Sequence, residues 1–178
     1  MNGFLLIGYN QAATEKVSSK NLEQEISRKG INYKKCVFNN KTFDNVISYQ
    51  FFKESDKITK QDSSLPILIS GDIYGYLKSE NAKLLNFNEA IKLVQDSNFD
   101  DKHVAFEGNA CIGLVTDEKL IFQTDLEGCR RLYYFQNKDI FCISTYLPLI
   151  LTVINEKWTL RKNAVLSYIC SRESKWPL

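Results

Sequence analysis

Residues 106–151, FEGNACIGLVTDEKLIFQTDLEGCRRLYYFQNKDIFCISTYLPLIL, decide the fold of this chain. The stretch contains four short apolar runs in two pairs, and turn-forming polar residues separate the members of each pair. The runs span 109–115, 119–124, 131–135 and 140–144. Apolar runs of this length on either side of a polar turn are typical of strand hairpins. We therefore expect four strands here, followed by an apolar helix at 146–154.

The rest of the chain adds further strands and helices to this series. Apolar runs predict strands at 3–9, 32–38, 45–52 and 65–69. Helical spacing and capping residues predict helices at 21–29, 86–97 and 161–171. Strands that come in hairpins, with helices not alternating one to one, favour an α+β fold of antiparallel sheets with helices packed outside.

Composition places the chain among ordinary globular proteins. It has 178 residues, of which 44% are hydrophobic and 25% charged. The formal net charge of +2 is too balanced to indicate binding to nucleic acid. The first apolar run, Phe4 to Gly8, is too short for a signal peptide or a membrane span. We therefore expect a cytoplasmic protein with neither a nucleic-acid nor a membrane partner.

The cysteines and the one histidine do not suggest a metal site. Five cysteines, an odd number without a Cys-x-x-Cys pair, indicate neither a disulfide framework nor a zinc site. Three lie within apolar strand patterns and are expected in the core: Cys36, Cys111 and Cys142. Cys129 follows a turn glycine and is expected to be exposed, and His103 is interpreted as a surface residue.

Four segments, in fixed order, resemble the N-terminal glutaminase domain of asparagine synthetases, a class II glutamine amidotransferase domain. Ile69 to Tyr76 is similar to that family's Asn-Gly-Glu-Ile-Tyr-Asn-Tyr, and Phe106-Glu107-Gly108 to its Leu-Asp-Gly. Thr124 to Tyr134 resembles Arg-Asp-Arg-x-Gly-x-Lys-Pro-Leu-Tyr-Tyr, and Phe141 to Thr145 resembles Phe-Ala-Ser-Glu. The resemblance implies a four-layer αββα sandwich of two antiparallel sheets flanked by helices.

The resemblance also implies a domain organisation. Residues 1–155 match the glutaminase domain, and residues 156–178 match a C-terminal helix and lead-out towards a synthetase domain. The Ser-Gly-Gly-x-Asp-Ser signature of that synthetase domain is not in this chain. The expected partner is therefore a synthetase domain in cis or in trans, and ATP and Mg²⁺ are expected only there.

The residues that cut glutamine in this family are replaced here. Its N-terminal cysteine, whose own α-amine serves as base, corresponds to Asn2 in Met1-Asn2-Gly3-Phe4. Its oxyanion-binding Asn-Gly corresponds to Ser70-Gly71, and the Asp that meets the substrate ammonium corresponds to Phe87. The segment that holds the glutamine carboxylate through an arginine has no counterpart. We expect a vestigial pocket at Asn2, Gly3, Ser70, Gly71, Asp72 and Phe87, without catalysis or metal.

This pattern predicts a non-catalytic domain that serves as scaffold or interaction module for an ATP-dependent amide-forming enzyme. β-Lactam synthetases and lasso-peptide cyclases are relatives that lack the cysteine, so a peptide or small-molecule substrate in natural-product cyclisation is expected. One alternative is an amidohydrolase with a non-standard nucleophile, Ser70 or Cys129. Another is a stand-alone subunit that pairs with a separate synthetase.

Two smaller clusters each allow two interpretations. Asp72, Tyr74 and Tyr76 either line the vestigial pocket or follow turns made by Gly71 and Gly75 at the end of a buried strand. Asp125 either has a role at the site or braces the turn at Gly128 through an ion pair with Arg130 and Arg131. In both clusters the structural interpretation is favoured.

Overall fold

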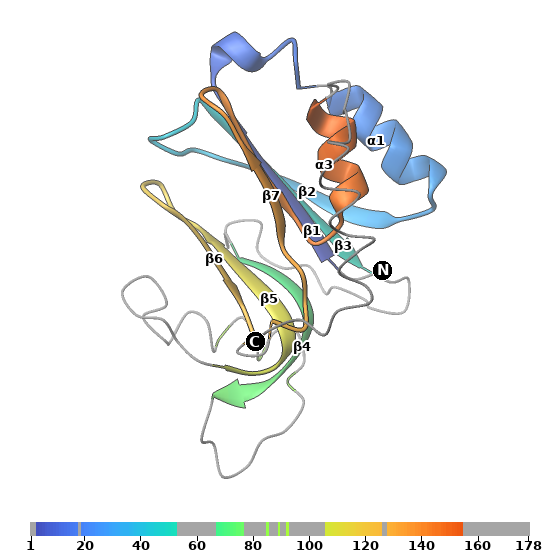
Figure 1. The fold of residues 1–178 in the computed structure, drawn as a ribbon, viewed down its shortest axis with the longest axis vertical. Coiled ribbons are helices and arrows are strands. Elements are labelled where there is room, and N and C mark those ends of the chain that lie inside the picture. The colour runs from blue at the N-terminus through green and yellow to red at the C-terminus, as the bar shows by residue number, and fades with distance from the viewer. Residues whose placement is uncertain are drawn as a thin grey trace, which may run out of the picture.

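Two antiparallel sheets and two helices make up the part of the chain that the computed structural model describes (Figure 1). That part comprises residues 3–17, 19–52, 67–76, 85, 89, 92, 106–125 and 128–154. The strands are β1 Gly3–Tyr9, β2 Asn32–Phe38, β3 Asn45–Phe52, β4 Ile67–Tyr76, β5 Phe106–Val115, β6 Leu120–Thr124, β7 Tyr133–Gln136 and β8 Ile140–Ser144. The helices are α1 Ser19–Arg28 and α3 Leu147–Ile154, with a short 3-10 turn η1 at Gln11–Ala13. The expected α+β class is confirmed.

The strands are ordered β2-β3-β1-β8-β7 in one sheet and β4-β5-β6 in the other. The N-terminal strand β1 is therefore the centre of the larger sheet, paired antiparallel with β3 on one side and β8 on the other. The two predicted hairpins of residues 106–151 separate between the sheets, because β5–β6 joins β4 whereas β7–β8 joins β1. Their placement in different sheets depends on long-range pairing, which hairpin signals cannot give.

Two predicted boundaries near the candidate site were wrong. The strand expected to end at Ile69 continues as β4 to Tyr76, and its partner β5 begins at Phe106 rather than at Asn109. Gly71, with φ of +100°, and an irregular register between Ile73 and Gly75 distort this pairing without ending it. A glycine tolerates such backbone angles without a steric cost, so the ladder continues through positions that read as turns.

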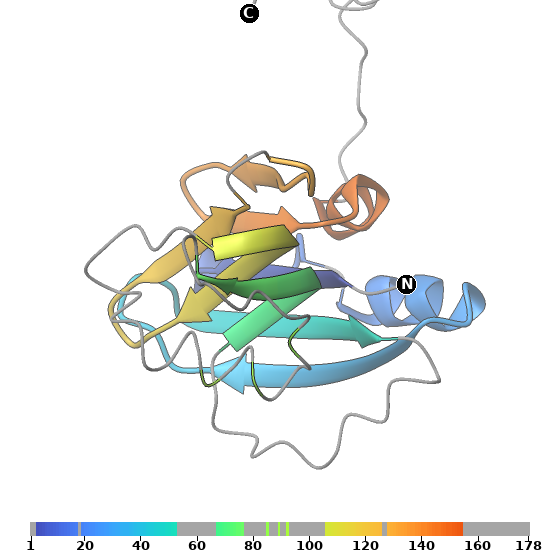
Figure 2. The ribbon, with the colours of Figure 1, turned by 90° about the horizontal axis from the view of Figure 1, so that it is seen from below.

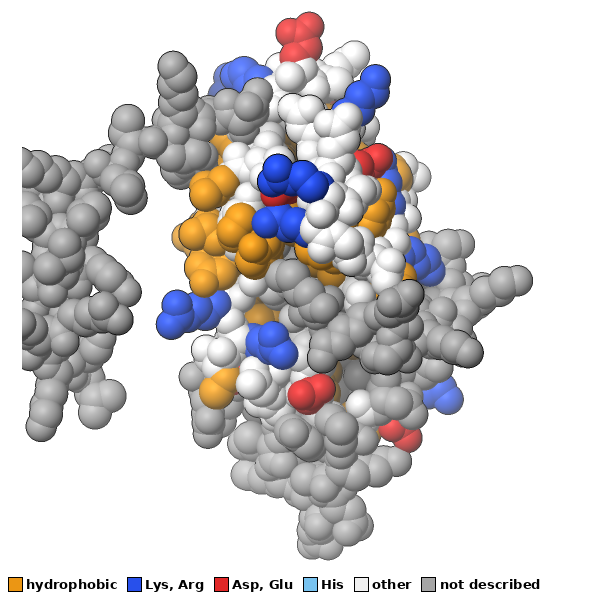
Figure 3. Space-filling model, turned by 90° about the vertical axis from the view of Figure 1, so that its right-hand side faces the viewer, with side chains coloured by type: hydrophobic (Ala, Val, Ile, Leu, Met, Phe, Trp, Pro, Cys, Tyr) orange, Lys and Arg blue, Asp and Glu red, His pale blue; other side chains and the backbone are white. Residues whose placement is uncertain are grey.

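Both helices cover one face of the five-stranded sheet, as Figures 1 and 2 show. Leu22 and Ile26 of α1 point inward one turn apart, and Gly30, with φ of +62°, follows the helix end as its stop signal predicts. α3 contributes Leu149, Ile150, Val153 and Ile154 to the same core. Figure 3 shows this helical side of the molecule, where basic and apolar side chains lie next to each other.

The opposite face of the five-stranded sheet packs on the three-stranded sheet. Side chains alternate along β1, so Leu5 and Ile7 face the helices while Phe4 and Leu6 face the second sheet. The ring of Phe4 stacks on Phe122 of β6 at 6.1 Å between centroids. Burial of these aromatic rings is the main apolar contact that holds the sheets face to face.

The outer face of the three-stranded sheet is also buried. Ile67, Ile69 and Ile73 of β4 form a third apolar cluster with Ala110 and Ile112 of β5, and Leu85 packs against it. Of the helix expected at 86–97, the structure describes Glu89 and Lys92, and both are helical. The rest of that range and the helix expected at 161–171 lie outside the described residues, as does His103. The described elements therefore form three layers, helix, sheet and sheet.

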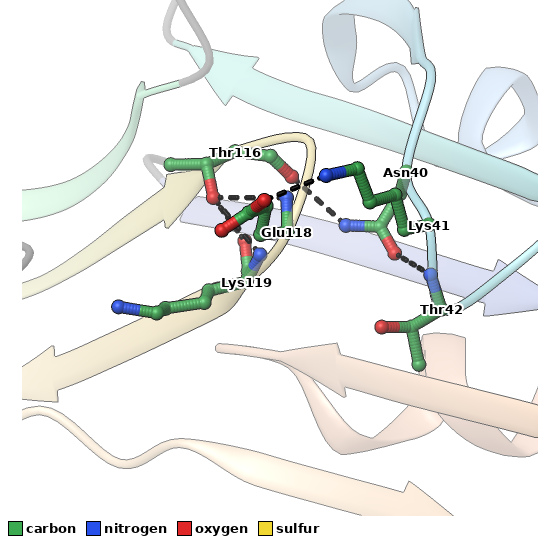
Figure 4. Close-up of polar contacts among 6 residues, drawn as sticks. All are labelled: Asn40, Lys41, Thr42, Thr116, Glu118 and Lys119. Carbon is green, nitrogen blue, oxygen red and sulfur yellow. Dashed lines mark hydrogen bonds and ion pairs between the residues drawn. The ribbon is translucent and has the colours of Figure 1, made fainter.

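Loop contacts join the two sheets at one end of the sandwich (Figure 4). The backbone N–H of Lys41 donates to the Asp117 carbonyl at 2.7 Å, and Asn40 Nδ2 donates to the Thr116 carbonyl at 2.8 Å. Lys41 also pairs with Glu118 at 2.6 Å, but both side chains are exposed, so this ion pair contributes little. The neutral hydrogen bonds fix the β2–β3 loop on the β5–β6 turn.

Neither described helix is long and apolar enough to cross a membrane.

Replacing Ile7 by Ala tests the central position of β1. Ile7 is 1% exposed between α1, α3 and the sheet, so truncation leaves a cavity and should lower the free energy of unfolding by about 2–5 kcal/mol. The control is Val37→Ala on edge strand β2, where the side chain is 67% exposed and the expected change is within about 0.5 kcal/mol. Equal losses in urea unfolding would contradict this arrangement of strands.

Candidate functional site

The described residues of the predicted pocket lie at one end of the sandwich, on facing strands of the two sheets. Gly3 is the first residue of β1, and Ser70, Gly71 and Asp72 follow one another in β4. Asn2 and Phe87 belong to the same prediction but lie outside the described residues. The structure therefore brings the position next to Asn2 towards the Ser70-Gly71 pair, which the sequence separates by more than sixty residues.

The side-chain amide of Gln50 connects these two positions. Its Nε2 donates to the carbonyl of Gly3 at 2.9 Å and to the carbonyl of Ile69 at 2.7 Å. Its Oε1 accepts from the backbone N–H of Ile69 at 3.1 Å. A further contact from Nε2 to the Phe51 carbonyl is long, at 3.4 Å. Gln50 lies on β3 next to β1, so one amide joins the start of the central strand to the residue before Ser70.

The start of β1 is held by hydroxyl groups at the end of β8. Thr145 Oγ1 accepts from the N–H of Phe4 at 3.1 Å, and Ser144 Oγ donates to the Phe4 carbonyl at 2.8 Å. A Cβ at Gly3 would overlap Thr145 Oγ1, so glycine is required at this close approach. These contacts fix Phe4, and with it the start of β1, against the end of β8.

Ser70 and Gly71 are the residues of the predicted pocket that lie next to each other on β4. The Ser70 side chain is fully buried, whereas Asp72 is exposed. A Cβ added at Gly71 would overlap the carbonyl oxygen of Asn109 on β5. Arg130 Nε donates to that same carbonyl at 3.4 Å, so its guanidinium lies beside Gly71. The site therefore combines a glycine with positive φ, a buried hydroxyl and one half-buried cation.

Asp125 organises the turn that carries Arg130. The carboxylate is 3% exposed and accepts backbone N–H groups from Cys129 at 2.9 Å, Ala110 at 3.2 Å and Arg130 at 3.3 Å. Burial by itself raises the pKa of Asp125, but these N–H groups outweigh burial and hold the pKa below its ordinary value. The prediction that Asp125 pairs with Arg130 and Arg131 was wrong. The Asp125 carboxylate braces the turn by accepting hydrogen bonds from backbone N–H groups instead.

Two buried cysteines, Cys111 and Cys142, are not activated. Burial, followed by the nearby Asp125 charge, raises the pKa of the Cys111 thiol to about 12, and burial raises that of Cys142 to about 12. Both thiols are therefore protonated and inert at neutral pH. Their expected core positions are confirmed, whereas Cys36 is only half-buried at the edge of the larger sheet. Cys129 is exposed, as expected.

Three residues that shape the site were missed by the sequence interpretation. Gln50 lies near the end of the predicted strand 45–52, Thr145 follows the predicted strand 140–144, and Arg130 was assigned to an ion pair. A glutamine within an otherwise apolar strand, Asn-Val-Ile-Ser-Tyr-Gln-Phe-Phe, was the one available signal, because a buried amide needs partners. No group of three or more His, Cys, Asp or Glu side chains suited to a metal occurs among the residues that the structure describes.

Comparison with known proteins does not identify a family. The sequence matches no protein-family model, and no curated protein is significantly similar to it.

Substituting Gly71 by Ala should be far more damaging than the same change at Gly30. Both have positive φ, and Gly30 has open space around it, so Gly30→Ala should cost about 1–2 kcal/mol of folding free energy. Gly71→Ala adds overlap with the Asn109 carbonyl and should cost more than about 3 kcal/mol in total. Comparable losses in denaturant unfolding would mean that the β4–β5 pairing is not as described.

The Asp125 carboxylate should stabilise the fold in a pH-dependent way. Its folded pKa is lowered, so the contribution is present above the unfolded pKa of about 3.9 and is lost as pH falls through the folded pKa. The stability difference between wild type and Asp125→Asn should therefore be constant near neutrality and shrink below about pH 4. The control is exposed Asp117→Asn on the β5–β6 turn. A difference that grows on acidification would contradict the assignment.

Proposed function

We propose that this chain is a non-catalytic, glutaminase-like domain that serves an asparagine-synthetase-like, ATP-dependent amide-forming enzyme. One observation carries the proposal: Gln50 joins Gly3, the first described residue of a central strand, to Ile69, the residue before Ser70-Gly71 on a second packed sheet. A fold that uses its N-terminal residue as nucleophile needs this arrangement, since the chain start must meet the oxyanion-binding backbone.

The chemistry at this end of the sandwich supports a role other than hydrolysis. The residue after Met1 is Asn2, which carries no thiol or hydroxyl that could attack an amide. The Ser70 hydroxyl is fully buried, which speaks against its use as an alternative nucleophile. Cys129 is exposed, but it is held in the Asp125 turn, and the one histidine of the chain is not next to it in sequence. A domain with these features retains the shape of the site without its reactive groups.

The fourth layer of an αββα sandwich belongs to the same proposal. The outer face of the three-stranded sheet is apolar and buried, and Glu89 and Lys92 next to it in the chain are helical. A helix over residues 86–97 would complete the sandwich by covering β4 and β5. The module would then be a closed unit in which a synthetase, in cis or in trans, contacts the surface rather than the core. ATP, Mg²⁺ and a peptide or small-molecule substrate would bind to that synthetase.

The purified chain should release no ammonia from glutamine above the buffer background. Loss of the nucleophile alone typically lowers turnover by several orders of magnitude. The Asn2→Ala variant is the matched control and should give the same background rate in a coupled ammonia assay. Turnover by the wild-type chain that disappears in Asn2→Ala would overturn the proposal, and turnover that survives Asn2→Ala but disappears in Cys129→Ala would favour the amidohydrolase alternative.

A further inference from the structure

Backbone groups of Gly3 and Ile69 make the three short hydrogen bonds of the Gln50 side-chain amide, and the Phe51 carbonyl adds a longer contact. The carbonyls of Gly3 and Ile69 both accept from Nε2, and the N–H of Ile69 donates to Oε1. Gly3 belongs to the larger sheet and Ile69 to the smaller one, so the two sheets together create this set. A primary carboxamide offers two N–H donors and one carbonyl acceptor, which is the complementary set.

We propose that the backbone at Gly3 and Ile69 forms a binding site for a primary carboxamide, and that the Gln50 side chain is its resident ligand. The two carbonyl acceptors determine which chemical groups fit. A carboxylate has no hydrogen to donate and would direct a negative oxygen at both carbonyls, which costs free energy in a partly buried place. A tertiary amide or an ester leaves the same two carbonyls without a donor. The site therefore selects the –CONH₂ group of an asparagine or glutamine side chain, or of an amidated peptide end.

The position of this carboxamide site is informative. It adjoins Asn2 and Ser70 in the chain, because Gly3 follows Asn2 and Ile69 precedes Ser70. A glutamine side chain of the protein itself thus binds the backbone of the two residues, Gly3 and Ile69, that adjoin the predicted pocket positions in the chain. The site follows from the hydrogen bonds alone and does not depend on the function proposed above.

Truncation of Gln50 and replacement of its lost group by acetamide test the site. Gln50→Ala removes the CH₂–CONH₂ fragment, which acetamide reproduces atom for atom. Titration of the ¹⁵N-labelled variant should shift the Ile69 backbone amide resonance in a saturable manner and raise the melting temperature. Wild-type protein should show neither effect, because Gln50 occupies the site. Acetate and N,N-dimethylacetamide are the control ligands, and neither should saturate, since neither donates a hydrogen bond.

Several results would overturn the carboxamide site. The first is an Ile69 resonance shift in Gln50→Ala that does not saturate with acetamide. The second is an equal shift of that resonance with acetate, and the third is an equal shift in the wild-type protein with acetamide. If Gln50→Ala is unfolded alone, folding induced by acetamide but not by acetate supports the site, and no folding with either counts against it. The wild-type protein provides a second measurement: the Gln50 side-chain N–H protons should exchange with solvent at least about tenfold more slowly than those of exposed Gln136. Equal exchange rates would likewise overturn the site.

Discussion

The Gln50 side-chain amide is the polar constraint on which the pocket end of the sandwich depends. Apolar packing brings the two sheets together, but burial is not directional, so it sets their contact without setting their exact offset. At this end, three hydrogen bonds between the Gln50 amide and the backbone of Gly3 and Ile69 fix the position of one sheet relative to the other. At the other end, the loop contacts of Asn40 and Lys41 do the same. The sheets are thus fixed at both ends, and the candidate pocket is built against the first of these two connections.

Glycines allow the approaches that this arrangement requires. Gly3 lies where any side chain would meet Thr145, and Gly71 lies where a Cβ would meet the Asn109 carbonyl. Positive φ at Gly71 and Gly108, on paired strands, concentrates backbone distortion around Asp72 and Asn109. Distortion of this kind persists where the surrounding structure determines it, and it gathers at functional sites more often than elsewhere. Here it coincides with the pocket that the resemblance to glutaminase domains places at Ser70-Gly71.

A site can keep its geometry after its chemistry has gone. The start of β1 and the Asp125 turn are held by hydrogen bonds between side chains and backbone, and the distorted β4–β5 pair by backbone hydrogen bonds. Asn2 carries no thiol or hydroxyl, and the Gln50 carboxamide is hydrogen-bonded to the carbonyl of the next residue, Gly3. These features are in keeping with the proposed non-catalytic role, in which the domain contributes its shape and contacts.

The sequence by itself determined the local elements. Apolar runs and turn residues predicted the eight strands that the structure describes, and Gly30 and the apolar residues after Tyr146 predicted its two described helices, because these signals act between near neighbours. It also determined that Asn2 cannot act as a nucleophile. Only the tertiary structure decided that β4 continues past Gly71, that Asp125 binds backbone rather than arginine, and that Gln50 meets Gly3 and Ile69. Those contacts join residues far apart in the chain, and no local pattern encodes which distant backbone group a polar side chain will find.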